Sequence, residues 1–205
     1  GMDIKVLVLD TQGYSNTGGQ ASMASYMSQN ADFASIGKEQ KGKTEGRKEL
    51  ANIALMHPNT YVSQTTCAHF NHFYRSIMEA NEHDGPAVVV AYSTCQPEHG
   101  VADNAAMHQA KLAVDSRAFP LMVYDPNKGS SIKERLELKG NPAVKDDWYT
   151  IRKTKETIDF ITFASSEGRF SKHFDKDGNP SGELLLAQQE RLENWHLLQE
   201  LAGII

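Results

Sequence analysis

The segment IKVLVL at residues 4–9 leads directly into the polar loop DTQGYSNTGGQ at residues 10–20. Its side chains are mostly β-branched or aliphatic, which predicts a strand that is buried on both faces. Residues 20–28 carry apolar side chains at positions compatible with a helix. The chain is therefore expected to open with a strand, a loop and a helix.

The same alternation of strand and helix continues along the chain. Strands are predicted at 60–66, 87–92 and 119–124, and helices at 48–56, 69–82 and 104–116. Residues 38–47 are interrupted by glycines and predict an exposed loop, and Pro120 indicates an edge strand or a strand start. Strands that alternate with helices pair in parallel through right-handed crossovers. The predicted fold class is α/β, with an open, mostly parallel sheet flanked by helices on both faces.

The pattern weakens after Tyr124 and recovers near the carboxyl terminus. Residues 184–202 predict a helix, because apolar side chains recur there at helical spacing: Leu185, Leu192, Trp195, Leu198 and Ala202. We expect this helix to dock on its own domain, and the alternative is a helix that binds a partner. The expected division is an α/β domain at 1–125 and an irregular and helical extension at 126–205 that packs on it.

Composition excludes several classes of protein. Of the 205 residues, 40% are hydrophobic, which argues against a disordered chain. The formal net charge is −5, and only a short basic patch between Lys38 and Lys48 gathers positive charge, so a nucleic-acid-binding surface is not expected. The longest apolar runs fall far short of the roughly 20 residues of a membrane span. Two cysteines do not make a disulfide scaffold, and a cytoplasmic protein is expected.

The loop at 10–20 lies where open α/β sheets bind ligands, beyond the carboxyl end of a strand. Its glycines permit close backbone approach, and Asp10, Thr11, Asn16 and Thr17 supply oxygens that suit Mg²⁺ bridging phosphates. Such composition is equally compatible with a structural turn. The loop lacks the Gly-Lys-Ser/Thr ending of a P-loop.

Several segments resemble one enzyme family. The loop is similar to the DTEVYSNTGGQ of the pyruvate:ferredoxin (flavodoxin) oxidoreductases, in their thiamine-diphosphate-binding domain. GRKELA at 46–51 resembles the family's GKKDLA, and DGPAVVVAYSTC at 84–95 resembles its GPSLVIAYxxC, with EHG following at 98–100. The resemblance covers roughly residues 4–125 and is much weaker beyond them.

The resemblance implies roles for particular residues. Thr11 corresponds to the side-chain ligand of Mg²⁺, and Gly13 to the residue that coordinates Mg²⁺ through its backbone carbonyl, where the family has Val. Asn16 corresponds to the catalytic residue beside the thiazolium of thiamine diphosphate, and Thr17 to a cofactor-binding residue. Cys95 corresponds to a thiolate ligand of a [4Fe–4S] cluster, which needs four such ligands.

Other parts of the family's sites do not occur in the sequence. The family's Gly-Asp-Gly motif, whose Asp completes the Mg²⁺ site, precedes the matched loop by about 30 residues in that family, and three cluster cysteines also precede it. The expectation is therefore a carboxyl-terminal piece of the thiamine-diphosphate domain of a long polypeptide. The piece alone is expected to be inactive and to lack tightly bound cofactor.

The resemblance also implies a reaction and partners. The expected activity of the whole protein is oxidative decarboxylation of pyruvate to acetyl-CoA, with coenzyme A as second substrate and ferredoxin or flavodoxin as electron acceptor. Further partners are the upstream domains of the same polypeptide and a second copy in a homodimer; nucleic acid and membrane are not expected. Two alternatives stay open: a degenerate module with a structural or subunit-contact role, and a related oxidoreductase for another 2-oxoacid.

Two weaker signals have ordinary explanations. His69 and His72 are three apart on a predicted helix, a spacing that suits a shared metal, but no third ligand is evident nearby. Partly buried histidines with structural roles are the preferred interpretation. Cys67 is expected to be a small buried side chain and not a reactive thiol.

Overall fold

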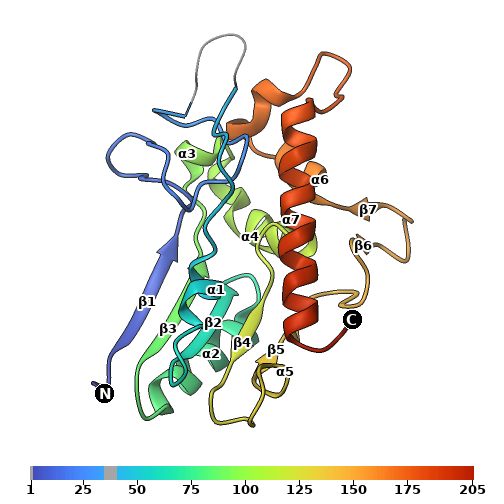
Figure 1. Ribbon diagram of the computed structural model, residues 1–205. Helices are drawn as coiled ribbons and strands as arrows, with labels where there is room; N and C mark the ends of the chain where they lie inside the picture. The colour runs from blue at the N-terminus through green and yellow to red at the C-terminus, as the bar shows by residue number, and fades with distance from the viewer. Residues whose placement is uncertain (1, 35–40) are drawn as a thin grey trace.

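A five-stranded sheet runs through the molecule in the order β1-β3-β2-β4-β5. The computed structural model describes residues 2–34 and 41–205 (Figure 1). The strands of this sheet are β1 (Lys5–Asp10), β2 (Tyr61–Thr66), β3 (Ala87–Tyr92), β4 (Met122–Tyr124) and β5 (Leu136–Glu137). A two-stranded sheet of β6 (Tyr149–Thr150) and β7 (Thr157–Ile158) lies apart from it.

The sheet is mostly parallel. β3 pairs in parallel with both β1 and β2, whereas β4 is antiparallel to β2 and to β5. β5 therefore runs with β1, β2 and β3, and β4 alone is reversed. The predicted α/β fold class is confirmed. One reversed strand agrees with the prediction of a mostly parallel sheet, and Pro120 lies just before this strand.

Helices cover both faces of the central strands. They are α1 (Leu50–Ala54), α2 (Phe70–Glu82), α3 (Gln96–His99), α4 (Ala106–Asp115), α5 (Ile132–Arg135), α6 (Phe160–Ser165) and α7 (Gly182–Leu201), with 3₁₀ turns at Asp103–Ala105 and Gly168–His173. Val90 and Tyr92 of β3 face a large core shared with α1, α4, α6 and α7, while Val89 faces Ile77 and Ala80 of α2. This alternation is the two-residue period of a strand between two helical layers.

The prediction that the first strand is buried on both faces is wrong for this chain. β1 lies at the edge of the sheet, and three of its apolar side chains are exposed: Val6 by 42%, Leu7 by 51% and Leu9 by 65%. Figure 1 shows β1 at the left margin, with no helix or strand on its outer side. The apolar pattern is that of an interior strand, but among the described residues β1 pairs only with β3.

The helix predicted at 20–28 does not form. Serine side chains hold the backbone there in turns: Ser25 Oγ accepts from the backbone N–H of Ser22 at 2.9 Å and donates to the carbonyl of Gln12 at 2.6 Å. Ser28 has a φ of 68°. Serine competes with the helix in this way by offering its own hydrogen bonds to nearby backbone groups.

The loop predicted at 38–47 begins at residues that lie outside the described part of the chain. Its described remainder is irregular, as expected, but it is not wholly exposed. Lys43 is 6% exposed and Arg47 is 7% exposed. Lys43 Nζ donates to the carbonyl of Ser25 at 2.9 Å, so this segment is held against residues 20–28. The helix predicted after it is confirmed in shortened form as α1.

The carboxyl-terminal helix α7 packs on the body of the protein. Trp195 and Leu198 are fully buried, whereas Leu185 is 48% exposed. The Trp195 indole N–H donates to the carbonyl of Asp146 at 3.0 Å. The expected docking of this helix on its own chain is therefore observed. None of the described helices combines the length and the apolar character that crossing a membrane requires.

Candidate functional site

The loop at 10–20 begins where β1 ends, beside the end of β3. Asp10 is paired with Tyr92 in the sheet, and the N–H of Ser93 donates to the carbonyl of Asp10 at 3.0 Å. The loop closes on itself, because the N–H of Tyr14 donates to the carbonyl of Gln20 at 3.0 Å. The chain thus places this loop at the carboxyl edge of the parallel strands, where ligands bind in open α/β sheets.

Two predicted Mg²⁺ ligands lie together in this loop. Thr11 Oγ1 donates to the carbonyl oxygen of Gly13, with 3.0 Å between the two oxygens. Ligands that are neighbours in an octahedron with Mg–O distances of 2.0–2.1 Å are separated by about 2.9 Å. Both residues also line a hollow of about 330 Å³ beside β1. The residues present therefore fit two adjacent positions of a magnesium shell.

The other predicted loop residues lie toward solvent. Asn16 and Thr17 are both exposed. The Thr17 hydroxyl donates to Oε1 of Gln20 at 2.6 Å, and the Gln20 amide donates back to the Thr17 carbonyl at 2.8 Å. This reciprocal pair stabilises the second half of the loop and leaves the Asn16 side chain at its tip.

The helix that follows Cys95 packs directly against the loop. Cys95 is half-buried and is the N-cap residue of α3. A side chain at Gly19 would collide with the carboxylate of Glu98 on α3, and Gly19 has a φ of 82°, which favours glycine. Partial burial raises the pKa of Glu98. The structure thus brings the element that carries Cys95 to the loop that carries Thr11 and Gly13.

His99 fixes the backbone at the start of the loop. Its Nε2 lies 2.9 Å from the carbonyl oxygen of Thr11, and the side chain is fully buried. Burial lowers the pKa of His99 to about 3, so the imidazole is neutral at pH 7. Because a carbonyl only accepts, the single proton of this ring is on Nε2. His99 is a positioning residue for Thr11.

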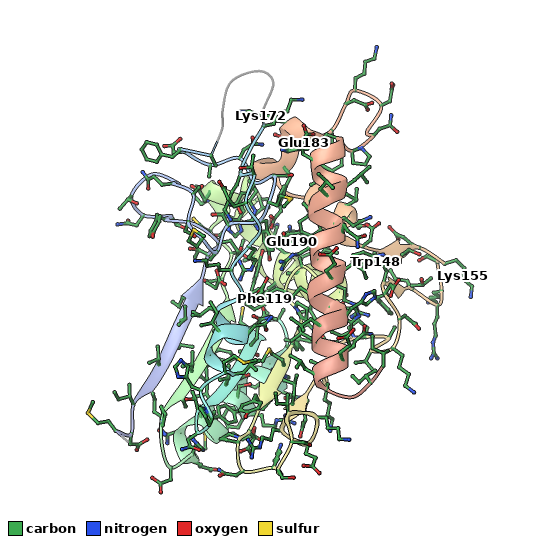
Figure 2. The ribbon with its side chains drawn as sticks, viewed as in Figure 1. Phe119, Trp148, Lys155, Lys172, Glu183 and Glu190 are labelled. Carbon is green, nitrogen blue, oxygen red and sulfur yellow. The ribbon has the colours of Figure 1, made fainter. Side chains whose placement is uncertain are left out.

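A buried network of ion pairs holds Asp10, the last residue of β1. Arg47 Nη2 lies 2.5 Å from Oδ2 of Asp10, and Arg47 Nε lies 3.1 Å from Oε1 of Glu49. Arg191 of α7 pairs with the same Glu49 carboxylate. The backbone N–H of Arg47 donates to Glu190 on α7, which Figure 2 labels near the middle of that helix. These pairs tie the loop's first residue to the carboxyl-terminal helix.

A second buried ion pair, Arg169–Glu167, contacts the loop at Gln12. Arg169 Nε donates to Oε2 of Glu167 at 2.5 Å, and both side chains are fully buried. The same guanidinium donates to Oε1 of Gln12 at 3.3 Å. It also lies over the ring of Tyr26, 5.3 Å from the centroid. The buried charged residues of the two networks were not predicted as site residues: Arg47, Glu49, Glu167, Arg169 and Arg191. The sequence offered one signal for them, because Arg191 is a charged residue within the apolar stripe of α7.

The described residues hold no cluster of three or more His, Cys, Asp or Glu side chains that would bind a metal ion. Cys67 and Cys95 are both free thiols, and Cys67 is exposed, contrary to the expectation that it is buried. One thiolate does not hold a cubane cluster. Cys95 therefore fits a cluster only when further thiolates come from outside this part of the chain.

His69 and His72 lie away from this loop. Both line a separate hollow of about 540 Å³ between α2 and Lys139–Gly140. His72 Nδ1 is hydrogen-bonded to Thr65 Oγ1 at 2.9 Å. Burial lowers the pKa of His72 to about 4, so the ring is neutral at pH 7 and has a structural contact.

This lowered pKa predicts a pH dependence of stability. The unfolded chain binds a proton at His72 near pH 6.5, whereas the folded chain does so near pH 4. Burial of neutral His72 therefore costs no stability above pH 6.5. Between pH 6.5 and pH 4 it lowers the free energy of unfolding by up to about 1.4 kcal/mol for each unit that the pH falls. Urea unfolding at pH 7, 6 and 5 measures it. His72→Gln should reduce the slope without removing it, because burial also lowers the pKa values of His69, His99 and His173. A variant with the wild-type slope would contradict the assignment.

Comparison with known proteins shows relatives over the whole chain. The chain is 32% identical over 206 residues to the pyruvate-flavodoxin oxidoreductase of Rhodospirillum rubrum, covering 100% of the chain and 16% of that protein. It is 32% identical to the pyruvate:ferredoxin oxidoreductase of Moorella thermoacetica, covering 98% and 16%. The pyruvate dehydrogenase (NADP+) of Cryptosporidium parvum is 34% identical over 173 residues, which are 83% of the chain and 8% of that protein. No family model matches the chain.

The sheet, its flanking helices and the loop at its carboxyl edge are consistent with a thiamine-diphosphate-type fold. The chain matches one segment of pyruvate:ferredoxin and pyruvate-flavodoxin oxidoreductases over nearly its whole length, as a fragment of such a protein would. It spans 16% of the length of these two relatives. The resemblance inferred from the motifs is confirmed, and the match extends through the tail, where the motifs were weak.

Proposed function

We propose that this chain is the part of a 2-oxoacid oxidoreductase that carries one side of its thiamine-diphosphate site. The whole protein would convert pyruvate and coenzyme A to acetyl-CoA and CO₂ in the cytoplasm, and pass electrons through iron–sulfur clusters to ferredoxin or flavodoxin. Thiamine diphosphate, when bound, supplies the electron sink for breaking the carbon–carbon bond. The chain's own residues bind and orient the metal–diphosphate end of that cofactor.

The observation that carries this proposal is the pairing of Thr11 and Gly13. Their oxygens lie 3.0 Å apart and line a hollow at the carboxyl edge of the sheet. The Thr11 hydroxyl and the Gly13 carbonyl would hold Mg²⁺, which would neutralise charge on the diphosphate. His99 holds the Thr11 backbone in place.

The remaining predicted residues extend the site outward. Asn16 and Thr17, at the exposed tip of the loop, would contact the diphosphate or the reacting end of the cofactor. Cys95, at the start of α3, would supply one thiolate of a [4Fe–4S] cluster. The other metal ligands, the other thiolates and the substrate-binding groups would come from other domains of the same polypeptide. The isolated chain would then be inactive.

The chain would be organised as an α/β portion at 1–125 with an extension at 126–205 packed on it, in a homodimeric enzyme. Aromatic residues of the extension support its packing on the α/β portion. Phe160 and Phe163 are fully buried, and their ring centroids lie 5.6 and 5.9 Å from that of Tyr26.

Thr11→Val tests the metal site in the full-length protein. The variant keeps the β-branched shape and removes the hydroxyl, so the affinity for thiamine diphosphate in the presence of Mg²⁺ should fall at least about 10-fold. Isothermal calorimetry on protein stripped of cofactor measures this affinity. Thr11→Ser keeps the hydroxyl and should bind like the wild type.

Equal affinities in wild type, Thr11→Val and Thr11→Ser would exclude Thr11 as a ligand. A full-length protein with no affinity for thiamine diphosphate would favour the degenerate structural module instead. A protein that binds the cofactor but turns over another 2-oxoacid in place of pyruvate would keep the site and change the substrate.

A further inference from the structure

The hollow of about 540 Å³ beside α2 has no part in the proposed reaction. It opens between the start of α2, which follows β2, and Lys139–Gly140, which follow β5. β2 and β5 run in the same direction, because β4 is antiparallel to both. The hollow therefore lies at the edge of the sheet where open α/β folds bind ligands.

Two histidines in the wall of this hollow have nitrogen atoms without partners. His69 Nδ1 and His72 Nε2 are buried and have no hydrogen-bond partner among the described residues. A Cβ atom added to Gly140 would lie 3.5 Å from His72 Cδ2, so the Cδ2–Nε2 edge of this ring faces the Gly140 side of the hollow. Buried polar atoms are usually hydrogen-bonded, and a ligand in the hollow would supply the missing partners.

The charge around the hollow is positive. Arg75 and Lys139 are its charged lining residues, and no carboxylate lines it. Arg75 is shared with Glu79 and Glu137, at 3.3 and 3.2 Å, whereas Lys139 is exposed and has no ion-pair partner among the described residues. Burial lowers the pKa values of the two histidines, so their rings are neutral donors at pH 7. The sign of this charge favours an anion over a metal ion.

The start of α2 adds backbone donors to the same hollow. The N–H groups of Phe70, Asn71 and His72 have no partner among the described residues, and the helix has no side-chain cap and no acidic residue in its first turn. Such amides bind anions. A phosphate monoester has three terminal oxygens and a charge of about −1.5 to −2 at pH 7, and it accepts more hydrogen bonds than a carboxylate.

The rest of the hollow has an apolar wall. Ala68 and Phe70 line it, and the Phe70 ring is 69% exposed. This ring stacks on Tyr74 with 6.2 Å between the centroids, which holds it in place. A volume of about 540 Å³ is typical of sites for whole small molecules and exceeds what a phosphate group fills. The ligand should therefore carry an apolar or aromatic body.

We propose that this hollow binds a phosphate monoester with an apolar body. The phosphate lies at the start of α2 beside Lys139, and the body lies against Phe70. When the Thr65 hydroxyl donates to His72 Nδ1, 2.9 Å away, the ring proton is on Nε2 and is donated to the phosphate. The proposal does not depend on the proposed function, because this hollow shares no lining residue with the hollow beside the loop at 10–20.

Isothermal calorimetry with phenyl phosphate tests the proposal in the full-length protein. Thiamine diphosphate and Mg²⁺ are present throughout, so that the loop at 10–20 is not the site measured. Phenyl phosphate should bind saturably with a Kd below about 1 mM, and inorganic phosphate at least about 10-fold more weakly, because only the former buries a ring.

Variants assign this binding to the hollow. Lys139→Glu should weaken the binding of phenyl phosphate at least about 10-fold, because a charged donor is lost and a like charge is added. Lys153→Glu is the matched control, because Lys153 is equally exposed and lies outside the hollow, and it should bind like the wild type. Phe70→Ala should weaken phenyl phosphate about 3- to 10-fold and leave inorganic phosphate unchanged.

Three results would overturn the proposal. The first is the absence of saturable binding, or an equal effect of Lys139→Glu and Lys153→Glu. The second is tighter binding of benzoate than of phenyl phosphate, which would identify a carboxylate ligand. The third is tight binding of Zn²⁺ that His72→Gln abolishes, which would identify a metal site in place of an anion site.

Discussion

Replacing Arg47 by methionine is expected to lower the free energy of unfolding by about 3–5 kcal/mol, because one cation is removed from between buried carboxylates. Arg47 pairs with Asp10 and Glu49, and its guanidinium is fully enclosed. Methionine restores much of the volume but none of the charge. The Asp10 carboxylate, at the root of the candidate loop, would lose its ion-pair partner in a buried position.

Urea unfolding monitored by circular dichroism measures this loss, and Lys48→Met is the matched control. Lys48 is the exposed neighbour of Arg47, so its replacement should change stability by less than about 0.5 kcal/mol. Equal effects of the two substitutions would show that the Asp10–Arg47–Glu49 network does not stabilise the fold. The loss of stability in Arg47→Lys should lie between the losses in Arg47→Met and Lys48→Met. The lysine ammonium keeps the charge but cannot bridge both carboxylates with the geometry of a guanidinium.

Replacing Cys95 by serine in the full-length protein is expected to remove one cluster of about four iron atoms per polypeptide and to abolish electron transfer to the acceptor. Serine should preserve the local fold, because Cys95 is the N-cap residue of α3 and serine is a strong N-cap. The expected loss is therefore of the cluster and not of the protein.

Iron content after anaerobic reconstitution, together with reduction of ferredoxin or flavodoxin, measures this effect. Cys67→Ser is the control, because Cys67 is exposed and its thiol donates a hydrogen bond to Met107 Sδ at 3.6 Å. Unchanged iron and unchanged electron transfer in Cys95→Ser would exclude it as a ligand. A loss of iron in both variants would indicate general instability of the clusters.

The central strands and helices were predictable from local pattern. β2, β3 and α2 lie within two residues of their expected limits, because their apolar periodicity and the turn at Gly85–Pro86 act over short distances. Position in the sheet was not predictable for β1. Its side chains are apolar on both faces, as in an interior strand, but among the described residues β1 lies at the edge of the sheet.

The irregular segments and the ionic contacts depended on long-range packing. The apolar positions of residues 20–28 suggested a helix, but the Ser25 hydroxyl donates to the carbonyl of Gln12, and Tyr26 is fully buried. Arg47 and Arg191 are 144 residues apart in the sequence and share the Glu49 carboxylate. Such a pairing has no local signature. The roles of the loop residues Thr11 and Gly13, in contrast, were predicted from the distinctive motif around them, and these roles stay a prediction.

The most direct test of the account is the reaction of the native protein that carries this sequence. The protein can be purified without oxygen from its source by an antibody against this chain. It should reduce ferredoxin or flavodoxin only when pyruvate and coenzyme A are both present. Acetyl-CoA should form in proportion to the acceptor that is reduced. A native protein that carries thiamine diphosphate and iron but shows no acceptor reduction with pyruvate and coenzyme A would contradict the proposed activity.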